Sequence, residues 1–319
     1  MDDGRPTEDW DPLDPQVKRD PHATYAELRR RCPVAYSHRW GGFWTLTRYE
    51  DIVAVAIDAH RFINSVQNVV PAVGFGKRIP LHADPPAHTQ YRRILTPPFR
   101  RERVATLEPQ VRRLAGPLLD ALVARGHGDV VEAFTYFLPV RVLCAFLNIP
   151  QADAAELKKR SERYADALHR GDYKTLKAES DALYAHARRV VAARQVIPLD
   201  PAEDVTSALL AARIDGEPLD EGLIVGCVRQ LLVAGHLTLT LSIASAVLHL
   251  ARHQDLQNKL RREPERIADA VEEFLRLYPP NRAFARTATC PVQVRKRTIQ
   301  ADEPIALLRS EERRVGKEC

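Results

Sequence analysis

The longest uncharged stretch of the chain runs from Gln230 to Ala251, between Arg229 and Arg252. As a helix, these residues would extend about 33 Å at 1.5 Å per residue. Leu, Val, Ile and Ala would point in most directions around it, so the pattern predicts burial on nearly all sides. Gln230, two His and several Ser and Thr interrupt the stretch, which favours the core helix of a soluble protein over a membrane span.

Small and weakly polar residues recur along this predicted helix at spacings of three and four. They share one face, and they are Gly235, Thr238, Ser242, Ser245 and His249. One interpretation is close packing against a neighbouring helix. The other is the approach of a flat, bulky ligand to the helix backbone, and periodicity alone leaves both open.

The rest of the chain is predicted to be mainly α with small β-sheets (α+β). A hairpin is expected where two short apolar runs meet across Gly41-Gly42. An uncharged stretch without a clear period predicts a long loop over Ile63–Gly76. Helices are predicted over His22–Arg31, Tyr49–Ile57, Ala87–Thr96, Glu203–Arg213, Gln254–Glu263 and Pro264–Leu277, with further helices in succession from Arg101 to Arg194, and strands over Val34–His38, Phe43–Thr47 and parts of Arg286–Gln300.

The composition is that of a soluble protein, with 45% apolar residues. The net charge of +5 is small beside 47 basic and 42 acidic side chains. The arginine pairs lie in helical patterns that also contain Asp and Glu, and no groove-reading motif accompanies them, so a nucleic-acid partner is not expected. A broad positive face could still receive an acidic protein.

The five cysteines are widely spaced and contain no CxxC pair. This excludes the common zinc spacings, argues against a disulfide framework and fits a reducing compartment. The first residues are acidic and rich in proline, unlike a signal peptide. We therefore expect a soluble cytoplasmic protein that is not associated with a membrane.

One candidate site lies just after Pro85-Pro86, where a helix is predicted to begin. His88 and Arg92 are four residues apart near its positive end, and two such donors suit a carboxylate or phosphate. A surface coincidence is the alternative. A metal site formed by His82, Asp84 and His88 is a second alternative, against which the Pro-Pro break and the lack of another Asp/His cluster argue.

Nucleotide and nucleophile motifs are absent. The sequence contains no GxGxxG, P-loop or GxSxG pattern, so it predicts no nicotinamide or nucleotide site. Glu273 and Arg276 form an E-x-x-R pair at the end of an apolar helix, directly before a Pro-Pro stop.

Taken in order, several segments resemble the cytochrome P-450 family, specifically its soluble bacterial members. DPPAHTQYRRIL resembles the haem-propionate helix, LLVAGHLTLT the oxygen-binding segment of the long central helix, and EEFLRLYPP the Glu-x-x-Arg helix. FARTATCPVQVRKRTIQADEPIALL resembles the strands that follow. The resemblance extends from about His22 to Leu308.

The resemblance implies haem b as cofactor and assigns roles to matching residues. His88, Arg92 and Arg286 would bind the haem propionates. Ala234 and Gly235 would lie over the haem face, and Thr238 would hydrogen-bond the bound oxygen and assist proton delivery. Glu273 and Arg276 would form a buried ion pair.

Two departures from the family pattern affect the expected chemistry. Leu237 stands where the family usually has an acidic residue, which implies proton delivery through water or another group and slower or less coupled oxygen activation. The Cys that ligates iron in the family lies in a Gly-rich loop that is not found before Leu308. We therefore interpret residues 1–308 as a truncated P-450 domain without its axial Cys. The last eleven residues, RSEERRVGKEC, resemble translated sequencing adapter, and Cys319 is not expected to be the ligand.

Two functional hypotheses follow. The first is a haem-thiolate monooxygenase that inserts oxygen into a small organic substrate with electrons from a ferredoxin-type partner, inactive in this chain because the Cys ligand is missing. The second is a non-catalytic helical protein that binds a ligand or a partner in the same cavity.

Overall fold

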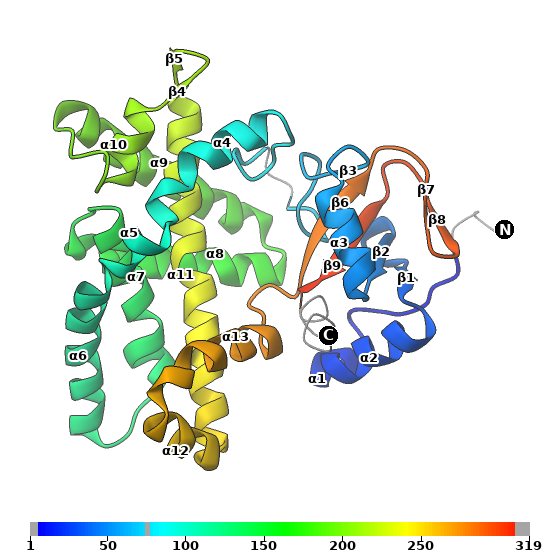
Figure 1. The fold of residues 1–319 in the computed structure, drawn as a ribbon, viewed down its shortest axis with the longest axis horizontal. Coiled ribbons are helices and arrows are strands. Elements are labelled where there is room, and N and C mark those ends of the chain that lie inside the picture. Colours follow the sequence, from blue (N-terminus) through cyan, green and yellow to red (C-terminus); the bar gives the residue numbers. More distant parts are fainter. Residues whose placement is uncertain (1–5, 74–76, 310–319) are drawn as a thin grey trace. The chain divides into compact units, whose positions relative to one another are not determined.

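The computed structural model describes residues 6–73 and 77–309. The chain forms two compact units (Figure 1). The sheet unit comprises Met1–Lys77, Leu81–Pro85 and Glu263–Cys319, and the helical unit comprises Arg78–Pro80 and Pro86–Arg262. The prediction of one domain over residues 1–308 stays a prediction. Of the predicted non-native tail, all residues after Arg309 lie outside the described part.

A five-stranded sheet forms the core of the sheet unit, in the order β1-β2-β9-β6-β3. Its one parallel pair is β2 with β9, and the other pairs are antiparallel. Trp44, Leu46 and Ile305 belong to its hydrophobic core, and every residue of the first two strands of the sheet is buried. The strands are β1 Val34–Ser37, β2 Phe43–Leu46, β3 Phe62–Ile63, β6 Ala283–Ala288 and β9 Pro304–Leu308, with a separate hairpin of β7 Val292–Val294 and β8 Arg297–Ile299.

Most predicted elements of the sheet unit are confirmed. Asp20 begins the second helix by accepting a hydrogen bond from the Ala23 amide at 3.1 Å. The β1–β2 turn needs glycine at Gly42, where φ is +105° and a Cβ would collide with the hydroxyl oxygen of Tyr36. The helices are α1 Pro15–Arg19, α2 Pro21–Arg31, α3 Tyr49–Ile57 and α13 Ile267–Leu277, with 3₁₀ turns at Arg39–Gly41 and Pro264–Arg266. The sequence pattern did not predict α1.

The helical unit packs its helices around the long helix α11, Glu221–Arg252 (Figure 1). The other helices are α4 Ala87–Leu95, α5 Arg101–Ala105, α6 Glu108–Arg125, α7 Phe137–Phe146, α8 Ala154–Arg170, α9 Tyr173–Val196, α10 Val205–Ala211 and α12 Gln254–Arg262. Shorter elements are 3₁₀ turns at Pro97–Phe99 and Gln151–Asp153, the π-helical turn η3 Val131–Thr135, and a hairpin of β4 Arg213–Ile214 and β5 Glu217–Pro218. The predicted α+β class is confirmed.

The long helix differs from its prediction in length and in burial. It begins nine residues earlier than the uncharged stretch, where Asp220 accepts a hydrogen bond from the Leu223 amide at 3.1 Å. Its first half is buried against α7, α8 and α9. The expectation of burial on nearly all sides is wrong for the second half, where Leu239, Leu241 and Leu248 are 47%, 53% and 51% exposed. Leu241 and Leu248 share one side of the helix, and Leu239 lies on the other side.

Within the described residues, α11 is also the one helix that is long and apolar enough to cross a membrane. Only 17% of its most apolar 18-residue window is buried. Length and composition alone are weak indications, because core helices of soluble proteins meet the same criteria.

Candidate functional site

The exposed part of α11 forms a continuous face, which we call the open stripe. It consists of Ala234, Thr238, Leu241, Ser245 and Leu248, which follow one another at spacings of four and three and therefore share one side of the helix. Ala234, Leu241 and Leu248 are exposed, and the two hydroxyl residues are partly exposed. A small residue beside apolar ones along a straight helix suits a flat, largely apolar ligand.

Thr238 brings a hydroxyl group to this stripe. Its Oγ1 donates a hydrogen bond to the carbonyl oxygen of Ala234 at 3.0 Å. The hydroxyl hydrogen is thereby committed to the backbone, while the oxygen lone pairs can accept a hydrogen bond. Leu237 precedes it, and Glu221 is the only acidic residue of α11, so no carboxylate of this helix lies next to Thr238.

Gly235 lies beside the stripe and against a neighbouring helix. A Cβ at this position would lie 2.6 Å from Cδ1 of Leu143 in α7. The packing interpretation of the small-residue pattern is therefore confirmed at Gly235. The placement of Gly235 over a haem face stays a prediction, and Ala234 and Thr238 are the residues that reach the open side.

His88 and Arg92 lie on α4, one turn apart, as their spacing predicted. Arg92 is exposed and forms no ion pair within the described part of the chain, whereas His88 is half-buried. Both belong to the helical unit, as α11 does. An unpaired guanidinium one turn from an imidazole fits an anionic group such as a carboxylate.

Arg286 lies on β6 of the sheet unit, opposite Ile305 of β9. Its Nη1 donates to Asn64 Oδ1 at 3.3 Å and to the Ala285 carbonyl at 2.9 Å. Burial lowers the pKa of Arg286, the charge of Arg309 lowers it further, and Asp84 opposes both. A half-buried cation beside a second cation favours an anionic ligand. The convergence of Arg286 with His88 and Arg92 stays a prediction.

The predicted pair of Glu273 and Arg276 is present in α13. Arg276 Nε donates to Glu273 Oε2 at 2.8 Å, and this hydrogen bond raises the pKa of Arg276. The Arg276 side chain is 16% exposed and that of Glu273 is 41% exposed. The pair is therefore half-buried rather than buried.

The metal alternative at His82, Asp84 and His88 receives no support. His82 Nε2 lies 2.8 Å from Asn68 Oδ1, and Asp84 accepts hydrogen bonds from the amides of Asn64 and Ser65 at 2.7 and 3.1 Å. The described residues contain no group of three His, Cys, Asp or Glu side chains that could hold a metal ion.

The cysteine environments are relevant to thiolate chemistry. Burial raises the pKa of Cys144 to about 11 and that of Cys227 to about 12. Burial also raises the pKa of Cys32. These three thiols remain protonated at neutral pH and are poor ligands. Cys290 is exposed, and Cys319 lies outside the described residues.

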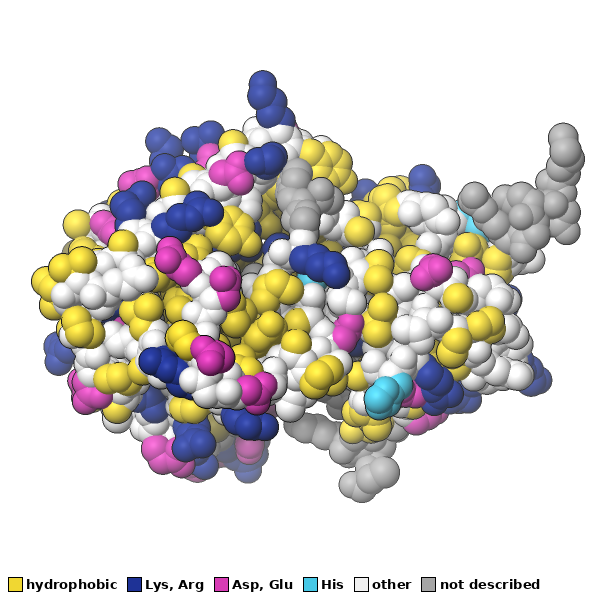
Figure 2. Space-filling view, turned by 90° about the horizontal axis from the view of Figure 1, so that it is seen from above, with side chains coloured by type: hydrophobic (Ala, Val, Ile, Leu, Met, Phe, Trp, Pro, Cys, Tyr) yellow, Lys and Arg dark blue, Asp and Glu magenta, His cyan; other side chains and the backbone are white. Residues whose placement is uncertain are grey.

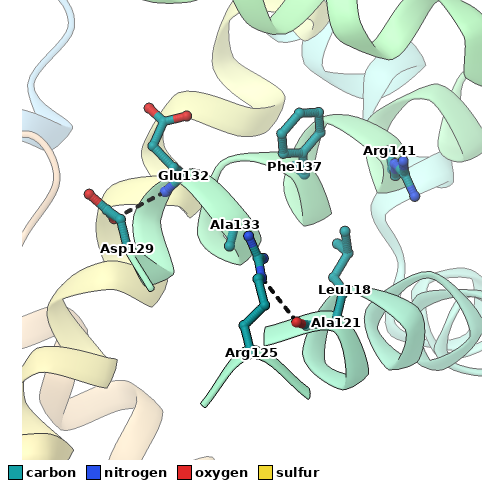
Figure 3. A pocket seen from close by; sticks show the side chains of 8 residues that line it. All are labelled: Leu118, Ala121, Arg125, Asp129, Glu132, Ala133, Phe137 and Arg141. Atoms are coloured by element: carbon teal, nitrogen blue, oxygen red, sulfur yellow. Dashed lines mark hydrogen bonds between the residues drawn. The ribbon is translucent and has the colours of Figure 1, made fainter. Parts of the chain in front are cut away.

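A surface pocket of about 470 Å³ lies elsewhere in the helical unit (Figure 3). Two arginines and two acids share it, and their contacts are local: Arg125 donates to the Ala121 carbonyl at 3.1 Å, and Asp129 accepts from the Glu132 amide at 3.2 Å. The pocket includes none of the predicted site residues. It is lined by Leu118, Ala121, Arg125, Asp129, Glu132, Ala133, Phe137 and Arg141.

Comparison with known proteins identifies the family. A model of the family described as Cytochrome P450 matches residues 131–310. Mycinamicin IV hydroxylase/epoxidase of Micromonospora griseorubida is 33% identical over 290 residues, which cover 88% of this chain and 72% of that protein. Vitamin D(3) 25-hydroxylase of Pseudonocardia autotrophica is 29% identical over 310 residues, covering 94% and 75%.

Similar solved structures indicate the same family. The crystal structure of CalO2 has a TM-score of 0.83 and 29% identity, covering 95% of this chain and 78% of that one. A Mycobacterium marinum cytochrome P450 in complex with pseudoionone has a TM-score of 0.81 and 27% identity, covering 93% and 77%. The chain belongs to the cytochrome P450 family.

Membership of this family confirms the predicted fold and function class. The class is that of haem-thiolate monooxygenases, oxidoreductases that incorporate oxygen into a substrate. The family implies a haem cofactor, an organic substrate and a redox partner. No comparison supports the alternative of a non-catalytic ligand-binding protein.

Proposed function

We propose that haem b lies against the open stripe of α11, with its propionates bound by His88, Arg92 and Arg286. The observation that carries this proposal is the exposed Ala234 beside Thr238 on a largely apolar helix face. Arg92 and Arg286 support it, since neither forms an ion pair among the described residues. Two propionates would supply the missing negative charge.

Each residue has a distinct task in this arrangement. The methyl side chain of Ala234 keeps the first turn of the stripe open, where a larger side chain would occupy the cofactor's place. Thr238 Oγ1, with its hydrogen held by the Ala234 carbonyl, accepts a hydrogen bond from a protonated group at the stripe. Since Leu237 provides no carboxylate, water carries protons to that hydroxyl. Bound haem supplies the redox chemistry for oxygen insertion.

None of the described cysteines serves as the axial ligand in this proposal. Cys32, Cys144 and Cys227 have raised pKa values, and a neutral thiol does not supply the electron density that a thiolate gives to iron. Haem bound at the open stripe is therefore not expected to take a thiolate ligand from Cys32, Cys144 or Cys227.

The proposal also includes a small organic substrate and a ferredoxin-type electron donor. It places the protein in the cytoplasm. The absence of nucleotide motifs from the sequence supports a separate electron donor, and the net charge of +5 supports an acidic one. Figure 2 shows Lys and Arg interspersed with Asp and Glu on the helical unit. On the face drawn there, docking would therefore depend on a local basic cluster.

Haem titration of the purified chain tests the cofactor site. We expect saturable binding of one haem, weakened about tenfold or more in Arg92→Gln and in Arg286→Gln, since a charge-assisted hydrogen bond contributes about 1.5–3 kcal/mol. Arg93→Gln, one residue along α4, is the control and should bind like the wild type. Equal binding by all four proteins would disprove the assignment. A thiolate-type Soret band of the reduced carbon-monoxide complex would disprove the cysteine proposal alone.

A further inference from the structure

A buried arginine in the first half of α11 is not used by the proposed haem site. Arg229 is 1% exposed. Its Nη2 donates to Ser180 Oγ at 3.0 Å, while Nε and Nη1 have no hydrogen-bond partner in the described part of the chain. Only one of the five N–H donors of this guanidinium is therefore used.

Aromatic rings and a second arginine surround Arg229. Its guanidinium carbon lies 5.6 Å from the ring centre of Tyr164 in α8 and 5.2 Å from that of Tyr184 in α9. Such contacts stabilise a cation without neutralising it. Arg78 is the second positive group: burial lowers its pKa, and the charge of Arg229 lowers it further, with Tyr164 opposing. Two cations thus share one largely aromatic environment.

The carboxylate of Glu179 does not provide the negative charge that a buried Arg229 requires. Glu179 precedes Ser180 in α9 and is 2% exposed, but it is bound by Arg160 at 3.2 Å and Arg163 at 2.9 Å. Arg229 forms no ion pair with any described residue. Burying a charge without a partner is strongly unfavourable, so a counter-ion from outside the chain explains the arrangement better than packing does.

We propose that Arg229, together with Arg78, Tyr164 and Tyr184, binds the carboxylate of an apolar organic acid. A carboxylate is a compact anion that only accepts hydrogen bonds and can take several N–H donors at once. The two tyrosine rings provide apolar surface for the adjoining hydrocarbon. Arg78 is partly exposed, so the acid enters on its side. The site is separate from the open stripe and does not depend on haem.

The test compares octanoate with octan-1-ol, which share an alkyl chain and differ in charge at neutral pH. Isothermal titration calorimetry on the haem-free 319-residue chain should show octanoate binding at least tenfold more tightly than octan-1-ol. Arg229→Met should abolish this preference. Arg163→Met, which removes an arginine of α8 that is paired with Glu179, should retain it. Equal binding of the two compounds by the wild type, or an unchanged preference in Arg229→Met, overturns the proposal.

A second variant covers the case in which Arg229→Met does not fold. Arg229→Lys keeps the charge and is expected to retain the preference for octanoate. In thermal unfolding, octanoate should raise the Tm of the wild type with increasing concentration, and octan-1-ol should not. If octanoate leaves the Tm of the wild type unchanged, Arg229 has a structural role only and the proposal is wrong.

Discussion

Thr238 Oγ1 donates its hydrogen bond to the carbonyl oxygen of Ala234, one turn earlier in α11, at 3.0 Å. Two residues further on, Thr240 lies on the opposite, buried face, and its Oγ1 has no hydrogen-bond partner among the described residues. The hydroxyl group of the partly exposed Thr238 therefore makes a hydrogen bond, whereas that of the buried Thr240 makes none with a described residue. The two threonines therefore differ in hydrogen bonding as well as in exposure.

The two threonines should respond differently to removal of the hydroxyl. Thr238→Val is expected to destabilise the chain by about 0.5–1 kcal/mol, because a hydrogen bond is lost. Thr240→Val should be neutral or stabilise by up to about 1 kcal/mol, because an unpaired buried hydroxyl is removed. Urea unfolding measures both. A larger loss of stability for Thr240→Val than for Thr238→Val would contradict this reading.

Gly235 should tolerate no branched side chain as long as Leu143 faces it. Gly235→Val is expected to cost about 1–3 kcal/mol of unfolding free energy through overpacking, and Leu143→Ala in the same chain should recover part of that cost. A double-mutant cycle gives the interaction energy. Gly116→Ala is the matched control, because a Cβ at this position in α6 meets open space, and it should stabilise by about 0.5–1 kcal/mol. If the effects of Gly235→Val and Leu143→Ala are additive, the contact with Leu143 is not what limits side-chain size at position 235.

His236 should make the stability of the chain depend on pH below neutrality. Burial lowers its pKa to about 4, from 6.5 in the unfolded chain, with the Leu232 carbonyl opposing. Between these values the unfolded state binds more protons than the folded state, so the free energy of unfolding falls as the pH falls from about 6.5 to 4. The slope is about 1.4 kcal/mol per pH unit at most for one histidine. Stability measured at pH 7 and pH 5 should show this loss.

Histidine substitutions test this assignment. His236→Gln should reduce the loss, and replacing the exposed His127 by Gln should not. His186 is expected to contribute to the pH dependence of stability in both variants, because burial also lowers its pKa. An unchanged pH dependence in His236→Gln would remove His236 as its source.

The buried carboxylate of Glu179 should contribute more to stability than an exposed one on the same helix. Glu179→Gln leaves Arg160 and Arg163 without their shared partner. We expect a cost of about 1–3 kcal/mol, lower than for a fully buried pair because both arginines reach solvent. Asp181→Asn is the control: Asp181 and its partner Lys177 are both 62% exposed, so the change should be below about 0.5 kcal/mol. Chemical denaturation of the two variants distinguishes the cases.

Local patterns predicted most elements because their signals lie within a few residues. Tyr49–Ile57 was predicted with the bounds that the structure shows, and α4 ends one residue before its prediction. The spacing of His88 and Arg92 was sufficient to place both on one helix. The ion pair of Glu273 and Arg276 was implied by the family resemblance, and the i,i+3 spacing is compatible with it.

Features that depend on tertiary contacts were not accessible from local patterns. The apolar run of α11 contains nothing to distinguish Leu232, which is buried, from Leu241, which is exposed, because the difference lies in which helices pack against each side. Arg229 marked only the end of an uncharged run in the sequence. Its burial arises from Tyr164, Ser180 and Tyr184, which belong to other helices, and an arginine beside an apolar run is the only signal that could have suggested it.

The parallel pairing of β2 with β9 joins Trp44 to Ile305, and the whole helical unit lies between these strands in the chain. During synthesis, therefore, β2 leaves the ribosome long before its partner exists, and the α11 segment is complete before β9 is made. Helices with local contacts form early, whereas a pairing across some 260 residues has to wait. The backbone groups of β2 that pair with β9 in the finished sheet therefore have no partner strand in the nascent chain. Chaperones or transient contacts would have to cover this strand edge during translation.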